Sequence, residues 1–370
     1  MVSIAIRYLV AAGTVYGWML AQDATKVAPI PRDPLELVSG PVEIAAAPET
    51  RTTALELANR ARDHYTLRSA LVGYDLKVHF TVDSGGATEY DGAWQMEDIF
   101  DPKQGLHWTA KSDSGYSITE ISVKGKHYAQ GTPGNFPLRL QEARAALLDA
   151  IPSPAYIQRH EIRTSAAVFD GSQVVCLLVA GFGTTESLPS GRSWDETEDC
   201  IDPQSGLLKM QSQAPGRYFS YDYTNAPSVA GHILPRNVTV TEGGKVVSKI
   251  TVDSLEELSS ADPSLFVPTP EMKQRGQPNI MAGAQKIWRD AGSPSFSLGG
   301  TIEPVCVFGL VTPSGKLIEA HSLQPSDPHS GEAVEAALHM SFPSPPVRGK
   351  ARPPAQQHFE FVYVMFASSR

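Results

Sequence analysis

Residues 97–106 read EDIFDPKQGL, and residues 198–207 read EDCIDPQSGL. The two stretches share the pattern Glu-Asp-x-x-Asp-Pro-x-x-Gly-Leu, and a tryptophan precedes each of them. An aspartate side chain accepts hydrogen bonds from the backbone that follows it, proline fixes φ, and glycine tolerates positive φ. Apolar residues flank both copies, so the repeat predicts two hairpins of one β-sheet. The predicted structural turn residues are Asp101, Pro102, Gly105, Asp202, Pro203 and Gly206.

The acidic residues of the repeat also raise the question of a metal site. A calcium loop places its acids at alternating positions and closes with a bidentate glutamate, and neither copy has that spacing. A solvated strand edge and a cation site at the rim of the sheet remain two interpretations of the second cluster. That cluster comprises Asp195, Glu196, Glu198 and Asp199. We favour the solvated edge and predict no metal site.

The composition is that of a globular protein with a packed core. The chain has 370 residues, of which 41% are apolar and 19% charged, and this length is sufficient for two domains. The net charge of −9 disfavours binding to a phosphate backbone. We therefore expect no nucleic-acid partner.

The N-terminal segment has the anatomy of a signal peptide. Arg7 supplies the positive region, and a thirteen-residue apolar run extends from Tyr8 to Leu20. This run is short for a spanning helix, which requires about 20 residues. We predict a cleaved signal peptide over residues 1–21, and export to the periplasm or cell envelope of a bacterium. An uncleaved anchor, which would give membrane contact, is the alternative.

Export changes the interpretation of the three cysteines. Cys176 lies in the apolar stretch SQVVCLLVAGF, and Cys200 precedes the second Asp-Pro turn. Two neighbouring strands can bring these thiols together in an oxidising compartment, so we predict a disulfide between them. Cys306 then remains as a buried apolar thiol.

The order of expected elements indicates an α+β fold. Residues 22–48 are proline-rich and are predicted to be a flexible tether. A helix from about residue 50, a long antiparallel meander and a helix in LQEARAALLDAIP are expected within residues 49–267, with residues 268–298 as a linker. Residues 299–368 are expected to form a small β-β-α-β domain, with strands in PVCVFGLVT, LIEAHSLQ and HFEFVYVMF.

The small domain resembles the C-terminal domain of TonB-type energy transducers. VTPSGKLIEAHSL is similar to the hairpin of that family, EAVEAALHMSFPSPP to its helix and exit, and HFEFVYVMF to its last strand. The resemblance implies a protein-interaction module linked to envelope transport. We expect an envelope protein segment to add a strand to an open edge at residues 358–366. The side chains expected on one face of that edge are Phe359, Phe361, Tyr363 and Met365.

The larger domain resembles the lipoprotein-carrier (LolA-like) half-barrel in its order of elements. That resemblance covers a helix, an antiparallel meander, a second helix that could fill the concavity, and further meander. It implies a concave apolar face that holds acyl chains or another lipid-like ligand. A periplasmic carrier or sensor of such a ligand is therefore the alternative function.

Motifs of catalysis and of nucleotide binding are missing from the sequence. We find no G-x-S-x-G, H-E-x-x-H, Walker A or Rossmann glycine pattern, and the ten histidines have no metal-ligand spacing. The sequence therefore predicts a non-enzymatic protein without cofactors or catalytic residues. A hydrolase is the least favoured alternative, because no nucleophile can be named for it.

Overall fold

A computed structural model describes most of the chain. The described residues are 36–37, 43–44, 48–85, 88, 90–133, 136–180, 196–275, 286–290, 301–342 and 358–368. The predicted signal peptide, residues 1–21, lies outside them. Among these residues, no helix is both long enough and apolar enough to cross a membrane.

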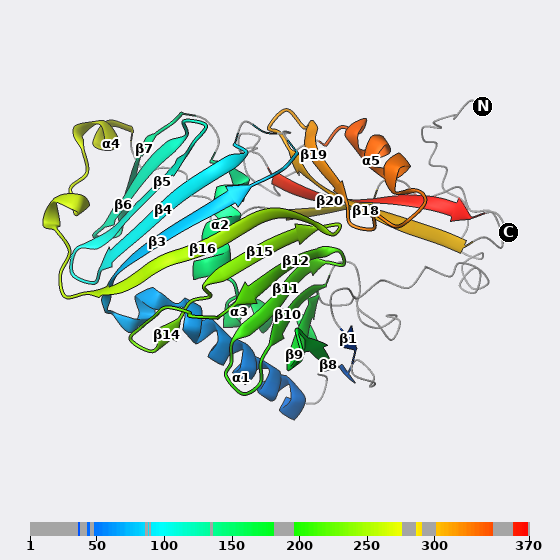
Figure 1. Cartoon of the computed structure of the whole chain (residues 1–370), viewed down its shortest axis with the longest axis horizontal. Helices are drawn as coiled ribbons and strands as arrows, with labels where there is room; N and C mark the ends of the chain where they lie inside the picture. The colour runs from blue at the N-terminus through cyan, green and yellow to red at the C-terminus, as the bar shows by residue number, and fades with distance from the viewer. Residues whose placement is uncertain are drawn as a thin grey trace, which may run out of the picture.

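A fourteen-stranded antiparallel sheet, called the large sheet below, dominates the α+β fold (Figure 1). Its strand order is β1-β8-β9-β10-β11-β12-β15-β16-β3-β4-β5-β6-β7, and β2 also pairs with β8. The strands are β1 (Glu36–Leu37), β2 (Glu43–Ile44), β3 (Gly73–Val82), β4 (Gly92–Asp101), β5 (Gly105–Ser112), β6 (Ser117–Val123), β7 (Lys126–Gly131), β8 (Glu161–Phe169), β9 (Ser172–Ala180), β10 (Thr197–Ile201), β11 (Leu208–Ala214), β12 (Arg217–Asp222), β15 (Asn237–Glu242) and β16 (Lys245–Leu258). The late strand β16 pairs with the early strand β3, so two meanders form one continuous sheet.

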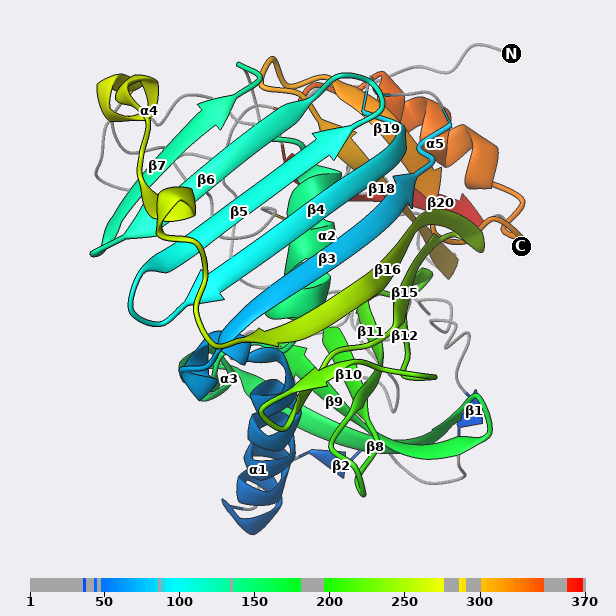
Figure 2. The same ribbon diagram turned by 60° about the vertical axis from the view of Figure 1, so that its left-hand side comes forward.

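The main helices lie on one face of this sheet, called the inner face below (Figure 2). The longer helices of this group are α1 (Pro48–Tyr65) and α2 (Leu138–Leu148), and the short helical turns are η1 (Leu67–Ala70) and α3 (Pro154–Ile157). The turn η2 (Pro263–Phe266) lies on the opposite face, where Phe266 shares a separate apolar cluster with Ile99 of β4. The largest apolar cluster contains Ala58 and Ala61 of α1, Leu140 and Leu147 of α2, and alternate residues of the central strands. A small hairpin, β13 (Ser228–Val229) with β14 (His232–Ile233), lies beside α1.

Alternation along β3 explains why this face is apolar. Leu76, Val78 and Phe80 are buried, whereas His79 and Thr81, which alternate with them, are exposed. Side chains of a strand point alternately to the two faces of its sheet, so one face of β3 enters the core and the other meets solvent.

The C-terminal residues form a second sheet of four strands, called the C-terminal sheet below. Its order is β17-β20-β18-β19, with α5 (Ser330–Leu338) on one face. The strands are β17 (Lys286–Asp290), β18 (Thr301–Val311), β19 (Leu317–Ser322) and β20 (His358–Ser368). The β-β-α-β order of β18, β19, α5 and β20 follows the predicted elements, and β17 is an additional strand.

The strand predicted to be an open edge is an interior strand. β17 pairs in parallel with β20 over Phe359–Tyr363, while β18 pairs with its other side. The prediction of an edge at Phe359, Phe361 and Tyr363 is therefore wrong, because part of the predicted linker occupies that position. Met365 lies beyond the residues that β17 pairs with.

Segments predicted to be tether and linker also contain short elements. Within residues 22–48, β1 and β2 pair with β8. Within residues 268–298, α4 (Pro270–Arg275) contacts β7, and β17 joins the C-terminal sheet.

Candidate functional site

Aromatic side chains form the floor beneath α2 on the inner face. Trp94 and Trp108 are buried, with 1% and 0% of their surfaces exposed. Phe80 stacks on Trp94 with ring centroids 5.5 Å apart, and Phe136 lies 5.7 Å from Trp108. These rings pack in the same apolar cluster as Leu140 of α2. The inner face is thus an apolar surface that a whole helix covers.

One side of α2 is held to the sheet by Arg144. Its guanidinium lies 3.1 Å from a carboxylate oxygen of Glu120 and 3.7 Å from one of Asp98, and 4.3 Å from the ring centre of Trp108. Burial raises the pKa of Glu120, and Arg144 opposes that rise. These contacts position the middle of α2 over β4, β5 and β6.

The first turns of α2 enter a buried group of charges, called the ionic joint below. It consists of Arg139, Glu142, Arg217, Glu242 and Glu319. Arg139 of α2 donates to both carboxylate oxygens of Glu242, at 2.7 and 3.0 Å, and to Glu319 of β19. Arg217 of β12 donates to Glu242 at 2.9 Å and to Glu142 at 2.6 Å. The joint therefore links α2, the large sheet and the C-terminal sheet.

The electrostatics of the joint follow from its burial. Burial by itself raises the pKa of Glu242, but Arg139 and Arg217 outweigh that effect and lower it to about 2. Arg217 also lies 4.0 Å from the ring centre of Phe308, and Arg139 lies 5.0 Å from that of Phe359. The rings of the C-terminal sheet thus cover the charges and keep water from them.

Within the part of the chain that the structure describes, two groups of side chains have the donor atoms of a metal site. Glu242, Glu319 and His321 lie close together, but Arg139 already binds both carboxylates. A metal cation there would have to compete with the buried guanidinium of Arg139. We therefore interpret this group as a network of ion pairs.

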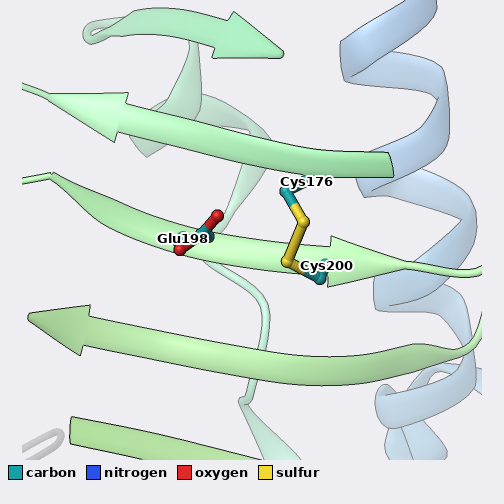
Figure 3. A group of neighbouring side chains, drawn as sticks. All are labelled: Cys176, Glu198 and Cys200. Atoms are coloured by element: carbon teal, nitrogen blue, oxygen red, sulfur yellow. A yellow bond between two sulfur atoms is a disulfide. The ribbon is translucent and has the colours of Figure 1, made fainter. Parts of the chain in front are cut away.

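The second group is closed by a disulfide. Cys176 of β9 and Cys200 of β10 lie directly opposite each other and are joined by the predicted bond (Figure 3). Their sulfur atoms are therefore not available as metal ligands, although Glu198 is nearby on β10. Cys306 is a buried free thiol, and burial raises its pKa.

The predicted turn residues lie at the ends of two hairpins. Asp101 is the last residue of β4 and accepts hydrogen bonds from the backbone N–H groups of Lys103 and Gln104, at 2.8 and 3.1 Å. Asp202 accepts from the backbone of Gln204 in the same way, at 2.8 Å. Backbone hydrogen bonding lowers the pKa of both aspartates, although burial opposes it. These carboxylates hold turns in place.

The acidic residues before the second turn are buried, so the prediction of a solvated strand edge is wrong for them. Glu196, Glu198 and Asp199 are at most 2% exposed, because β10 lies between β9 and β11 inside the large sheet. Arg163 of β8 binds Glu196 at 2.7 Å, and Asp199 accepts from Gln211 at 2.9 Å. Asp195 and the preceding Trp194 lie outside the described residues.

A small polar pocket lies away from these sites. It has a volume of about 240 Å³ and lies between β6, β7 and α4, with Thr119, Gln130 and Glu271 in its lining. An acyl chain requires an apolar lining, so this pocket does not suit a lipid-like ligand.

The five residues of the ionic joint were not predicted from the sequence. Arg139 and Glu142 occur in a helix that was expected to fill the concavity, and charged residues in such a helix must find buried partners. Charged residues in a helix that is expected to be buried are therefore the sequence feature that could have indicated the ionic joint. This feature does not name the partners, because Glu242 and Glu319 are 103 and 180 residues away from Arg139.

The chain is similar to several solved structures at low identity. No family model matches it, and no curated protein matches it. A domain from Vibrio parahaemolyticus named for outer-membrane lipoprotein sorting is 9% identical, with a TM-score of 0.35, over 57% of this chain and 95% of that domain. The MucA/MucB complex of Pseudomonas aeruginosa is 12% identical, with a TM-score of 0.27, over 71% of this chain and 81% of that chain. LprF from Mycobacterium bovis is 10% identical, with a TM-score of 0.21, over 62% of this chain and 99% of that chain.

Since no family model matches the chain, the resemblance of residues 299–368 to the TonB family stays a prediction from the sequence.

Proposed function

We propose that this protein is a non-enzymatic sensor of the bacterial cell envelope that binds a lipid-like ligand on its inner face. The observation that carries the proposal is the position of α2, which covers a floor of buried aromatic rings. The part of the inner face that binds the apolar side chains of α2 would also accept acyl chains, since both are bound by removal of apolar area from water. The ligand would take the place of α2.

The way in which α2 is held supports a sensor more than a simple carrier. Eight of its eleven residues are buried. The buried Arg139 and Glu142 form ion pairs, and so does the partly buried Arg144. A ligand would have to compete with these contacts, so binding would be coupled to a change in the position of α2. A carrier of permanently open form has no such coupling.

Two features typical of exported proteins support the same proposal. The Cys176–Cys200 disulfide is of the kind that persists in oxidising compartments, and the N-terminal sequence has signal-peptide anatomy. The proposed location is therefore the periplasm or the envelope surface that faces it.

The fluorescent apolar probe N-phenyl-1-naphthylamine tests this function. We expect its emission to increase on addition of the full-length protein, and we expect lysophospholipid to displace it. Substitution of Trp108→Ala should weaken probe binding, whereas Tyr156→Ala, at a 41% exposed side chain away from the floor, should leave it unchanged. Absence of saturable probe binding would contradict the proposed ligand class.

A further inference from the structure

The C-terminal sheet contacts the part of α2 that has the weakest support of its own. The residue before the helix is Pro137, and its side chain makes no capping hydrogen bond. The first turn carries no acidic residue that would interact favourably with the helix dipole. A helix of eleven residues is marginal by itself in water. The position of α2 therefore depends on what packs around its first turns.

Those neighbours come largely from the C-terminal sheet. Leu138, the first residue of α2, belongs to an apolar cluster with Phe308 of β18 and Phe359 and Phe361 of β20. Only Ala214 in that cluster comes from the large sheet. The start of α2 is thus enclosed between the two sheets.

The charges repeat this pattern. Arg139 binds Glu242 of the large sheet and Glu319 of the C-terminal sheet. The joint contains three carboxylates and two guanidinium groups, and His321 of β19 lies 3.3 Å from Glu319. If the C-terminal sheet moved away, Glu319 and the covering rings would leave and water would enter. An ion pair in water is about four times weaker than at an effective dielectric constant of 20, so the remaining contacts of Arg139 would weaken.

Backbone contacts show how closely the C-terminal sheet approaches the hairpin tips of the large sheet. A Cβ on Gly216 would lie 2.1 Å from the carbonyl oxygen of Leu323, and one on Gly243 would lie 2.0 Å from that of Ser322. Both distances are impossible for a real side chain. In the same turn, a Cβ on Gly244 would meet nothing within 4 Å.

We propose that the C-terminal sheet locks α2 on the inner face, so that release of this sheet frees α2 and uncovers the aromatic floor. The inference that α2 is released follows from the contacts of Leu138 and Arg139 with the C-terminal sheet. Its consequence for a lipid-like ligand rests on the proposed function. A partner that binds the C-terminal sheet would in this way control access to the inner face.

Hydrogen exchange of the full-length protein, without any ligand, tests the lock. Gly243→Ala should increase exchange about tenfold in residues 317–323 and also in residues 138–148, because opening of the contact exposes both segments. Gly244→Ala is the matched control, since Gly244 also has a positive φ (81°, against 56° for Gly243) but a Cβ there meets nothing within 4 Å. In this control, both segments should stay near their original rates.

Because Gly243 adjoins Glu242 of the ionic joint, a second pair of variants changes buried phenylalanine side chains instead of the hairpin glycines. Phe361→Leu loosens the cluster that encloses Leu138, whereas Phe342→Leu changes an equally buried phenylalanine in the cluster that contains Ala333 and Ala337 of α5. We expect faster exchange of residues 138–148 only in Phe361→Leu. Unchanged exchange of α2 in both Gly243→Ala and Phe361→Leu overturns the lock. Failure of the proposed function would instead appear as absence of probe binding even after α2 is released.

Discussion

Glu242 lies at the centre of the ionic joint, where two guanidinium groups bind its carboxylate. Arg139 and Arg217 together lower its pKa from the usual 4.5 to about 2. A carboxylate with a lowered folded-state pKa stabilises the fold above its unfolded pKa, and this contribution disappears as the pH falls toward the folded value. The contribution of Glu242 is therefore complete above about pH 4.5 and is lost between about pH 4.5 and 2.

This sign gives a prediction for acid unfolding. Glu242→Gln should flatten the decrease of unfolding free energy between pH 4.5 and 2, by on the order of 3 kcal/mol. Urea titrations at several pH values measure this slope, and Glu256→Gln, at an exposed residue of β16, provides the control. If Glu242→Gln and the wild type lose stability equally over this range, the ionic joint does not contribute as described.

Single residues could be predicted from the sequence where their partners are local. Asp101 and Asp202 bond the backbone two residues ahead of them, and the Asp-Pro-x-x-Gly pattern contains all that is needed. The partners of Arg139 could not be predicted, because Glu319 is 180 residues away. For the same reason the sequence could not tell that Glu196 is buried against Arg163.

Two adjacent strands, β9 and β10, carry the disulfide. Cys176 and Cys200 are paired in register, and 24 residues separate them along the chain. A crosslink restricts the unfolded chain and by this means stabilises the folded one, by roughly 3 kcal/mol for a loop of this size.

The double variant Cys176→Ala/Cys200→Ala should lower the unfolding free energy by roughly 3 kcal/mol. Urea unfolding of the wild type with a reductant should give the same loss, and the reductant should have no effect on the variant. A wild-type protein that is insensitive to reduction after unfolding and refolding would show that the bond contributes nothing.

Among the elements, those with strong local patterns were the predictable ones. The alternation in YDLKVHFTV predicts β3, and the helical spacing in LQEARAALLDAIP predicts α2. The role of β20 was not predictable, because its neighbour β17 comes from a proline- and glycine-rich segment and pairs in parallel. A five-residue strand in such a segment has no periodicity that distinguishes it from a loop.

At the scale of the molecule, the two sheets form one assembly around α2. The α+β class and the large antiparallel sheet follow from the order of the sequence patterns. Contact between the sheets does not follow from that order. It depends on glycines at the hairpin tips, on the apolar cluster around Leu138 and on the ionic joint. We interpret this assembly as a closed state of a ligand sensor.

The most direct test of this account is hydrogen exchange of α2 in the full-length protein with and without bound N-phenyl-1-naphthylamine. The account predicts that saturating probe increases exchange in residues 138–148 and protects the strands that carry Trp94 and Trp108, since probe and helix compete for one surface. Exchange in residues 161–169 of β8 serves as an internal reference and should not change. Saturable binding that leaves residues 138–148 as protected as in the free protein would contradict the claim that the ligand replaces α2.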